Sequence, residues 1–227
     1  AHHDGNLSGR LSDARFLATP TAFSKAEVTN DSLVVVDAAG AVVAGRHRVF
    51  SEIGIHLSLY ATRPDVAAVV HAHSPHATAL AACGQALEVF LPEAVVSLGP
   101  TVPLVPLTAP GSPQVAALSP LLPFHDVVLI AGNGVLGFGD SLEQAYLRVE
   151  LVEHLARIFL LALPAGGVKP LPDTMLRPLL EARKKAGLGP EARGLVVPAV
   201  PSGSAPSSSD RLLSMIREEV TTALRNA

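Results

Sequence analysis

Two histidines separated by one residue are the clearest candidates for chemistry in this sequence. His71 and His73 close the stretch 65–73, where valine and alanine predominate, as is typical of a buried strand. Side chains alternate along a strand, so both imidazoles point to one face, about 7 Å apart. From there they can reach a single cation at about 2.0–2.1 Å. The alternative is two core histidines hydrogen bonded to neighbours, although a same-face pair is costly to bury without a shared partner.

Short elements with clear turn signals surround this strand. A helix over 51–62 is predicted just before it, with Ser51 as the cap or in the first turn and Pro64 at the end. Apolar periodicity and turn residues predict further helices over 75–82, 112–122 and 142–163. Strands are predicted within 7–17, and over 32–37, 42–44, 126–131 and 135–139, with extended chain over 91–94 and 102–106.

The composition changes after Pro164. A linker leads to an amphipathic helix over about 173–186, a segment rich in Pro, Gly and Ser up to residue 209, and a helix over about 210–225. We therefore predict one domain over residues 1–163 and a C-terminal extension over 164–227. The chain starts like the middle of a loop, so we expect a segment before it.

Composition excludes several classes of function. The chain has 227 residues, 48% of them hydrophobic, a formal net charge of −3 and only 4% aromatic residues, which argues against nucleic-acid binding. A single cysteine, Cys83, forms no internal disulfide, and with no secretory signal we expect a cytoplasmic protein. No uninterrupted apolar run has the length of a membrane span.

Several short motifs occur together in a familiar order. They are Gly5-Asn6-Leu7-Ser8-Gly9-Arg10, Thr19-Pro20-Thr21, Ser51-Glu52, Arg63-Pro64-Asp65, His71-Ala72-His73, Leu91-Pro92-Glu93, Pro110-Gly111-Ser112 and Asn133-Gly134. In this order and spacing the chain resembles the class II aldolase/adducin family, which includes L-fuculose-phosphate aldolase and L-ribulose-5-phosphate 4-epimerase. The resemblance covers residues 1 to about 163.

The resemblance implies an α/β fold of three layers, α/β/α, with a mostly antiparallel central sheet, and a homotetramer. It implies a divalent cation, usually Zn²⁺, held by His71 and His73 with a third histidine before a glycine. Glu52 corresponds to the acid/base. The anion-binding loops correspond to Gly5, Asn6, Thr19, Thr21 and Ser51, and we expect His76 to orient a metal ligand from behind.

The chain departs from the family at three of these positions. Asn133 stands where the third histidine is expected, and an amide oxygen is a poorer zinc ligand than imidazole. Three outcomes are open: Asn133 binds the metal weakly, Glu52 or water completes the metal's coordination shell, or the site has lost its metal. Phe50 replaces a serine of the anion loop, and Ala22 replaces a glycine, although alanine resists a positive φ. Both changes weaken the prediction of a phosphorylated substrate.

The sequence favours a metal-dependent aldolase acting on a small sugar-derived or sugar-phosphate substrate. Removing a proton next to a carbonyl creates an enediolate, whose charge a cation stabilises while Glu52 moves the proton. The alternatives are an adducin-like domain that binds a partner without catalysis, and an epimerase or dehydratase on the same fold. Asn133 favours the adducin-like domain, and the retained His71, His73 and Glu52 favour the enzyme.

Overall fold

A computed structural model describes residues 4–196 together with residues 214, 215, 218 and 222. The Pro/Ser-rich segment beyond residue 196 and most of the helix predicted over 210–225 lie outside these described residues. Within them, no helix combines the length and apolar character that crossing a membrane requires.

An eight-stranded sheet forms the centre of the fold, in the order β4-β3-β2-β1-β5-β10-β9-β8. Every neighbouring pair is antiparallel except β8 and β9. The strands are β1 (Asn6–Ser12), β2 (Arg15–Ala18), β3 (Val34–Asp37), β4 (Val42–Ala44), β5 (Ala68–Ala72), β8 (Leu104–Val105), β9 (Val127–Ile130) and β10 (Gly134–Gly139). The pair β6 (Leu87–Glu88) and β7 (Thr101–Val102) stands apart.

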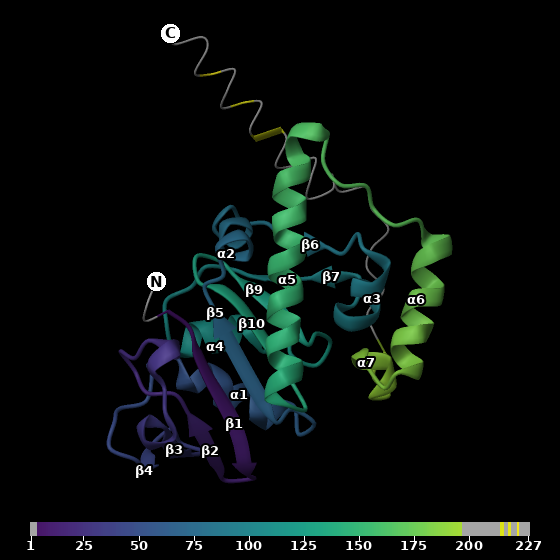
Figure 1. Ribbon diagram of the computed structural model, residues 1–227. Helices are drawn as coiled ribbons and strands as arrows, with labels where there is room; N and C mark the ends of the chain where they lie inside the picture. Colours follow the sequence, from purple (N-terminus) through teal and green to yellow (C-terminus); the bar gives the residue numbers. More distant parts are fainter. Residues whose placement is uncertain (1–3, 197–213, 216–217, 219–221, 223–227) are drawn as a thin grey trace.

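Helices cover both faces of this sheet (Figure 1). Helices α2 (Pro75–Ala82) and α5 (Leu142–Ala162) pack on one face, and α1 (Ile53–Thr62) and α4 (Ser112–Leu118) on the other. Strand β9 shows why both faces are apolar, because Val127 and Leu129 enter one core while Val128 and Ile130 enter the other. The predicted three-layer α/β/α architecture with a mostly antiparallel sheet is confirmed.

The C-terminal extension runs back from the end of α5 along the side of the domain (Figure 1). Its helix α6 (Asp173–Lys185) lies against α3 (Pro92–Leu98), and Leu176, Leu179 and Leu180 pack on the core beneath α2 and α5. A short helix, α7 (Gly189–Ala192), follows. The division of the chain near residue 163 stays a prediction.

Two sequence expectations need correction. The segment 91–94 is not extended, because Pro92 opens helix α3, where a proline in the first turn loses no hydrogen bond. Helix α1 begins at Ile53 with Glu52 at its N-cap position, so Ser51 precedes the cap. Glu52 makes no capping hydrogen bond to the helix, and its carboxylate points elsewhere.

Candidate functional site

The two histidines converge at the end of strand β5. His71 is the fourth residue of the strand and is buried, while His73 follows the strand directly. Their rings lie nearly perpendicular, with centroids 5.1 Å apart, and their Nε2 atoms are 3.1 Å apart. The pair therefore directs two nitrogen lone pairs or N–H groups at one point.

A carboxylate held by two amides stands beside the pair. Glu52 Oε2 lies 3.6 Å from His71 Nε2. Asn6 Nδ2 donates to Oε2 of Glu52 at 2.9 Å, and Asn133 Nδ2 donates to Oε1 at 2.5 Å. Strands β1 and β10 are the two neighbours of β5, so the amides approach Glu52 from opposite sides of the histidine strand. Each oxygen of the carboxylate thus has its own donor.

Glycines beside the two asparagines allow this close approach. Gly5 has a φ of 76°, and a Cβ there would lie 2.5 Å from the carbonyl oxygen of His71. Gly134 has a φ of 90°, and a Cβ there would lie 2.3 Å from the carbonyl oxygen of Ala72. Any larger residue would collide with the backbone of β5. Gly5 brings β1 against the histidine strand, and its role in anion binding stays a prediction.

Burial sets the protonation of these groups. Desolvation lowers the pKa of His71 to about 4, against the opposing influence of Glu52, so its imidazole is neutral near pH 7. Burial alone would raise the pKa of Glu52, but His71 and the amides of Asn133 and Asn6 outweigh it and keep that pKa below its ordinary value. A neutral imidazole next to an ionised carboxylate is the state in which both groups can bind a cation.

The spacing of His71 and His73 fits two ligand positions of a divalent cation. Two nitrogens bound to one tetrahedral ion at about 2.0–2.1 Å stand roughly 3.3 Å apart, close to the observed 3.1 Å. Within the described part of the chain, no group of three or more His, Cys, Asp or Glu side chains is arranged to hold a metal. Asn133 supplies no imidazole, and its amide nitrogen is bonded to Glu52.

The predicted anion loops are largely occupied by internal contacts. The Thr19 hydroxyl accepts from the backbone N–H of Leu7, and the Asn6 amide is used on Glu52. The backbone N–H of Thr21 donates to the carbonyl of Arg48, and Ser51 is exposed and its hydroxyl makes no hydrogen bond to another described residue. Ala22 adopts a φ of 61°, so the loop keeps the left-handed turn that alanine was expected to resist.

A cavity of about 400 Å³ opens next to Glu52, between the start of α1 and the start of α4. Its walls are mainly apolar, with Ile55, Pro110 and Val115 among them, and no lysine or arginine lines it. Gln114 also lines it; this residue is 7% exposed, and its carboxamide has no hydrogen-bond partner among the residues described. Gln114 was not predicted from the sequence as a residue of the site, because a lone glutamine in a helix has no distinctive pattern. Phe50 is buried against His56 and lines no part of the cavity.

Two other histidines near the site have separate partners. His56 is buried, and its Nδ1 lies 2.7 Å from Ser8 Oγ, which also contacts Tyr60 at 2.8 Å. His76 pairs through Nδ1 with Glu153 at 2.7 Å, and Glu153 also accepts from the backbone at the start of α2. No hydrogen bond joins His76 to His71 or His73 in the described structure, so its predicted orienting role lacks a contact.

Comparison with known proteins agrees with this geometry. Residues 1–160 match the family described as the class II aldolase and adducin N-terminal domain. The chain belongs to the class II aldolase and adducin family.

Relatives and solved structures place it among the enzymes of that family. It is 34% identical to 3-oxo-tetronate 4-phosphate decarboxylase of Haemophilus influenzae over 77% of this chain and 85% of that protein. It is 30% identical to L-fuculose phosphate aldolase of Methanococcus vannielii over 68% of this chain and 82% of that protein. A solved L-fuculose 1-phosphate aldolase superposes with a TM-score of 0.73 at 30% identity, over 79% of this chain and 85% of the other.

These matches confirm two predictions, the class II aldolase/adducin family and an enzyme of the aldolase type. Divalent metal ions, oligomers and small-molecule substrates are typical of class II aldolases. The metal content, the oligomeric state and the site residues of this chain remain predictions.

Proposed function

We propose that this protein is a metal-dependent carbon–carbon lyase that cleaves a small sugar-derived substrate next to its carbonyl group. The observation that carries the proposal is the convergence of His71, His73 and Glu52 at the end of β5, where His71 Nε2 lies 3.1 Å from His73 Nε2 and 3.6 Å from Glu52 Oε2. The family membership supports it, because the curated relatives include aldolases and decarboxylases.

His71 and His73 would hold the cation, with Glu52 in reach of it. A cation bound there would stabilise the negative charge that develops on a substrate carbonyl oxygen when the neighbouring bond breaks. Glu52 acts as acid and base, because its carboxylate is ionised and both of its oxygens are fixed in direction by amide donors. Asn6 and Asn133 are positioning residues that act through Glu52.

The cavity favours an uncharged distal part of the substrate. A phosphorylated substrate requires donors for its phosphate, and the predicted loops spend the Thr19 hydroxyl and the Asn6 amide internally. The mainly apolar walls beside Glu52 and the free carboxamide of Gln114 suit a hydroxyl or carbonyl group carried on a short carbon chain. We therefore propose a substrate without phosphate.

Decarboxylation is the second candidate. Loss of carbon dioxide leaves the same negative charge next to a carbonyl as loss of an aldehyde, so one site supports either leaving group. The 34% identity to a 3-oxo-tetronate 4-phosphate decarboxylase favours it.

The proposal is tested with dihydroxyacetone in deuterated buffer, where NMR follows exchange of the protons next to the carbonyl. With Zn²⁺ added, the protein should catalyse exchange, and Glu52→Gln should slow it by roughly 10²–10⁴-fold. Glu93→Gln, which changes an exposed carboxylate at the start of α3, is the matched control and should keep the wild-type rate. Equal rates in Glu52→Gln and the wild type would remove Glu52 from the mechanism.

A further inference from the structure

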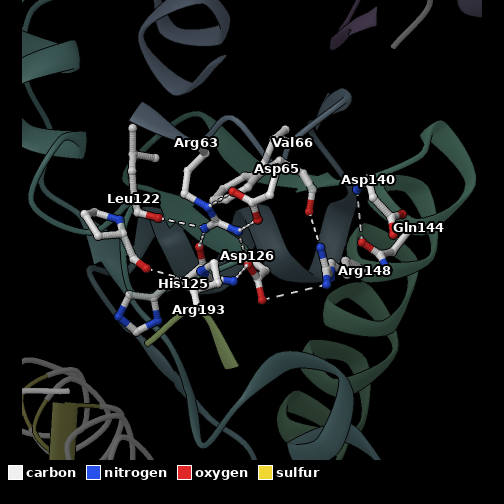
Figure 2. A network of polar contacts seen from close by, with 12 residues as sticks. Arg63, Asp65, Val66, Leu122, His125, Asp126, Asp140, Gln144, Arg148 and Arg193 are labelled. Carbon is white, nitrogen blue, oxygen red and sulfur yellow. Dashed lines mark hydrogen bonds and ion pairs between the residues drawn. The ribbon is translucent and has the colours of Figure 1, made fainter. Parts of the chain in front are cut away.

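A second polar cluster, far from the histidines in sequence, surrounds the buried carboxylate of Asp126 (Figure 2). Its side chain is only 1% exposed, yet four arginines form ion pairs with it. Arg63 and Arg193 contact Oδ1 at 2.9 and 3.2 Å, and Arg183 and Arg148 contact Oδ2 at 2.7 and 3.7 Å. A carboxylate carries one negative charge, so these guanidinium groups far exceed what Asp126 can neutralise.

The arginines differ in how many of their hydrogen bonds are made. A guanidinium group has five N–H donors. Arg63 uses all five, on Asp65, Asp126 and the carbonyls of Leu122 and His125. Arg193 makes two hydrogen bonds, to Asp126 and the Pro123 carbonyl, and its Nε is buried without a partner. Arg148 makes one, to the carbonyl of Phe138.

Three of the arginines line a common cavity, and two of them, Arg148 and Arg193, have unused donors. Arg63, Arg148 and Arg193 line a space of about 150 Å³ between the end of β10, the start of α5 and the segment 187–193. Asp65, Asp126 and Asp140 also line it, so three carboxylates balance the three guanidinium groups on its walls. Arg148 and Arg193 keep N–H donors that no described protein group accepts, above all the buried Nε of Arg193, and such donors favour a bound oxyanion.

Neighbouring glycines leave room for these guanidinium groups. A Cβ on Gly139 would lie 3.1 Å from Nη1 of Arg148, and one on Gly189 would lie 2.6 Å from Nε of Arg183. The backbone is therefore shaped around the arginine cluster from both the domain and the C-terminal extension.

We propose that this cavity is a binding site for a small oxyanion, of which inorganic phosphate is the simplest. The oxyanion accepts hydrogen bonds from Arg148 and Arg193 and so joins α5 to the segment 187–193 of the C-terminal extension. This site is separate from the proposed catalytic site, and neither proposal depends on the other.

Titration calorimetry of the full chain with phosphate, at an ionic strength held constant with chloride, tests this. We expect binding of one phosphate per chain, weakened about tenfold or more in Arg193→Gln because a charge-assisted hydrogen bond is lost. Arg177→Gln is the matched control, since it removes a positive charge from an exposed position on α6 and should bind like the wild type. If Arg193→Gln folds poorly, Arg193→Lys replaces it in the same titration, because it keeps the positive charge but removes the guanidinium donors. It should also bind phosphate more weakly than the wild type.

Three outcomes overturn the proposal. The first is a phosphate titration that releases no more heat than a matched chloride titration, which would mean that the cavity holds water and not phosphate. Another is equal phosphate affinity in Arg193→Gln and the wild type. The third is binding that survives Arg193→Gln but disappears in His73→Ala, which would place the phosphate at the histidine pair. In support, phosphate should slow amide hydrogen exchange in 187–193.

Discussion

Asn133 Nδ2 donates a hydrogen bond of 2.5 Å to Oε1 of Glu52. Asn133 occupies the position where the family resemblance places a third metal-binding histidine. The substitution exchanges a ligand for a hydrogen-bond donor. The carboxylate gains a second fixed contact, opposite the one from Asn6. In this chain the residue at the third ligand position therefore supports Glu52. A cation bound at the histidine pair would have two imidazoles, with the rest of its ligands supplied by the carboxylate or by water.

Restoring the histidine should strengthen metal binding. Asn133→His adds an imidazole next to a neutral pair, and we expect zinc affinity to rise by about tenfold or more. Competition with a chromogenic chelator measures the affinity. Asn133→Ala, which removes the amide without adding a ligand, is the control and should not tighten binding. An unchanged affinity in Asn133→His would show that the position does not face the cation.

Removing one of the two amide donors should move the pH dependence of activity. Asn6→Ala takes a hydrogen bond from the ionised form of Glu52, so the pKa of Glu52 rises. As a base Glu52 works ionised, and the acidic limb of the exchange rate should move to higher pH. The proton-exchange assay measures this limb, with Thr21→Ala as a control that leaves it in place. A purely structural role for Asn6 would lower the rate equally at every pH.

Glycine 5 should be intolerant of a side chain for steric reasons. Gly5→Ala sets a Cβ 2.5 Å from the carbonyl of His71, and its φ of 76° is unfavourable as well. Gly84→Ala is the matched control, with a φ of 70° and nothing within 4 Å. Urea unfolding should show a loss of about 1 kcal/mol for Gly84→Ala and roughly 3 kcal/mol or more for Gly5→Ala. Equal losses would mean that the backbone angle alone matters.

The histidine pair was predicted from local pattern, and the three layers were predicted from the family resemblance. The valines before His71 and the continuous apolar run of β9 indicate buried strands from local sequence alone. Hydrogen-bond partners that are distant in sequence could not be predicted from local pattern. The bonds from Asn6 and Asn133 to Glu52 span 46 and 81 residues, and they depend on β1 and β10 flanking β5.

The Asp126 cluster was missed for the same reason. Its arginines lie at positions 63, 148, 183 and 193, in separate elements and without any shared motif. Only the folded chain, with α6 packed against α3 and the segment 187–193 near the start of α5, brings them together.

The buried His56 should make the folded state sensitive to acid. Burial lowers its pKa to about 3, from 6.5 in the unfolded chain. Between these values the unfolded state binds a proton that the folded state does not, so stability falls as pH decreases below 6.5, by up to about 1.4 kcal/mol per pH unit. Urea unfolding from pH 7.5 to 5 should show a shallower decline in His56→Gln, which cannot titrate. Parallel declines would exclude His56 as a cause.

Asp126 should hold the C-terminal extension on the domain. Asp126→Asn removes the charge that faces four arginines, two of which, Arg183 and Arg193, belong to the extension. Removing one partner of a buried ion pair leaves like charges facing each other, at a cost of about 3–5 kcal/mol. We expect a lower unfolding midpoint in urea and faster proteolysis in the glycine-containing linker at residues 166–167. Asp13→Asn, in the exposed turn between β1 and β2, controls for loss of charge alone. If the linker of Asp126→Asn is cleaved no faster than that of the wild type, the apolar contacts of Leu176, Leu179 and Leu180 suffice to hold the extension.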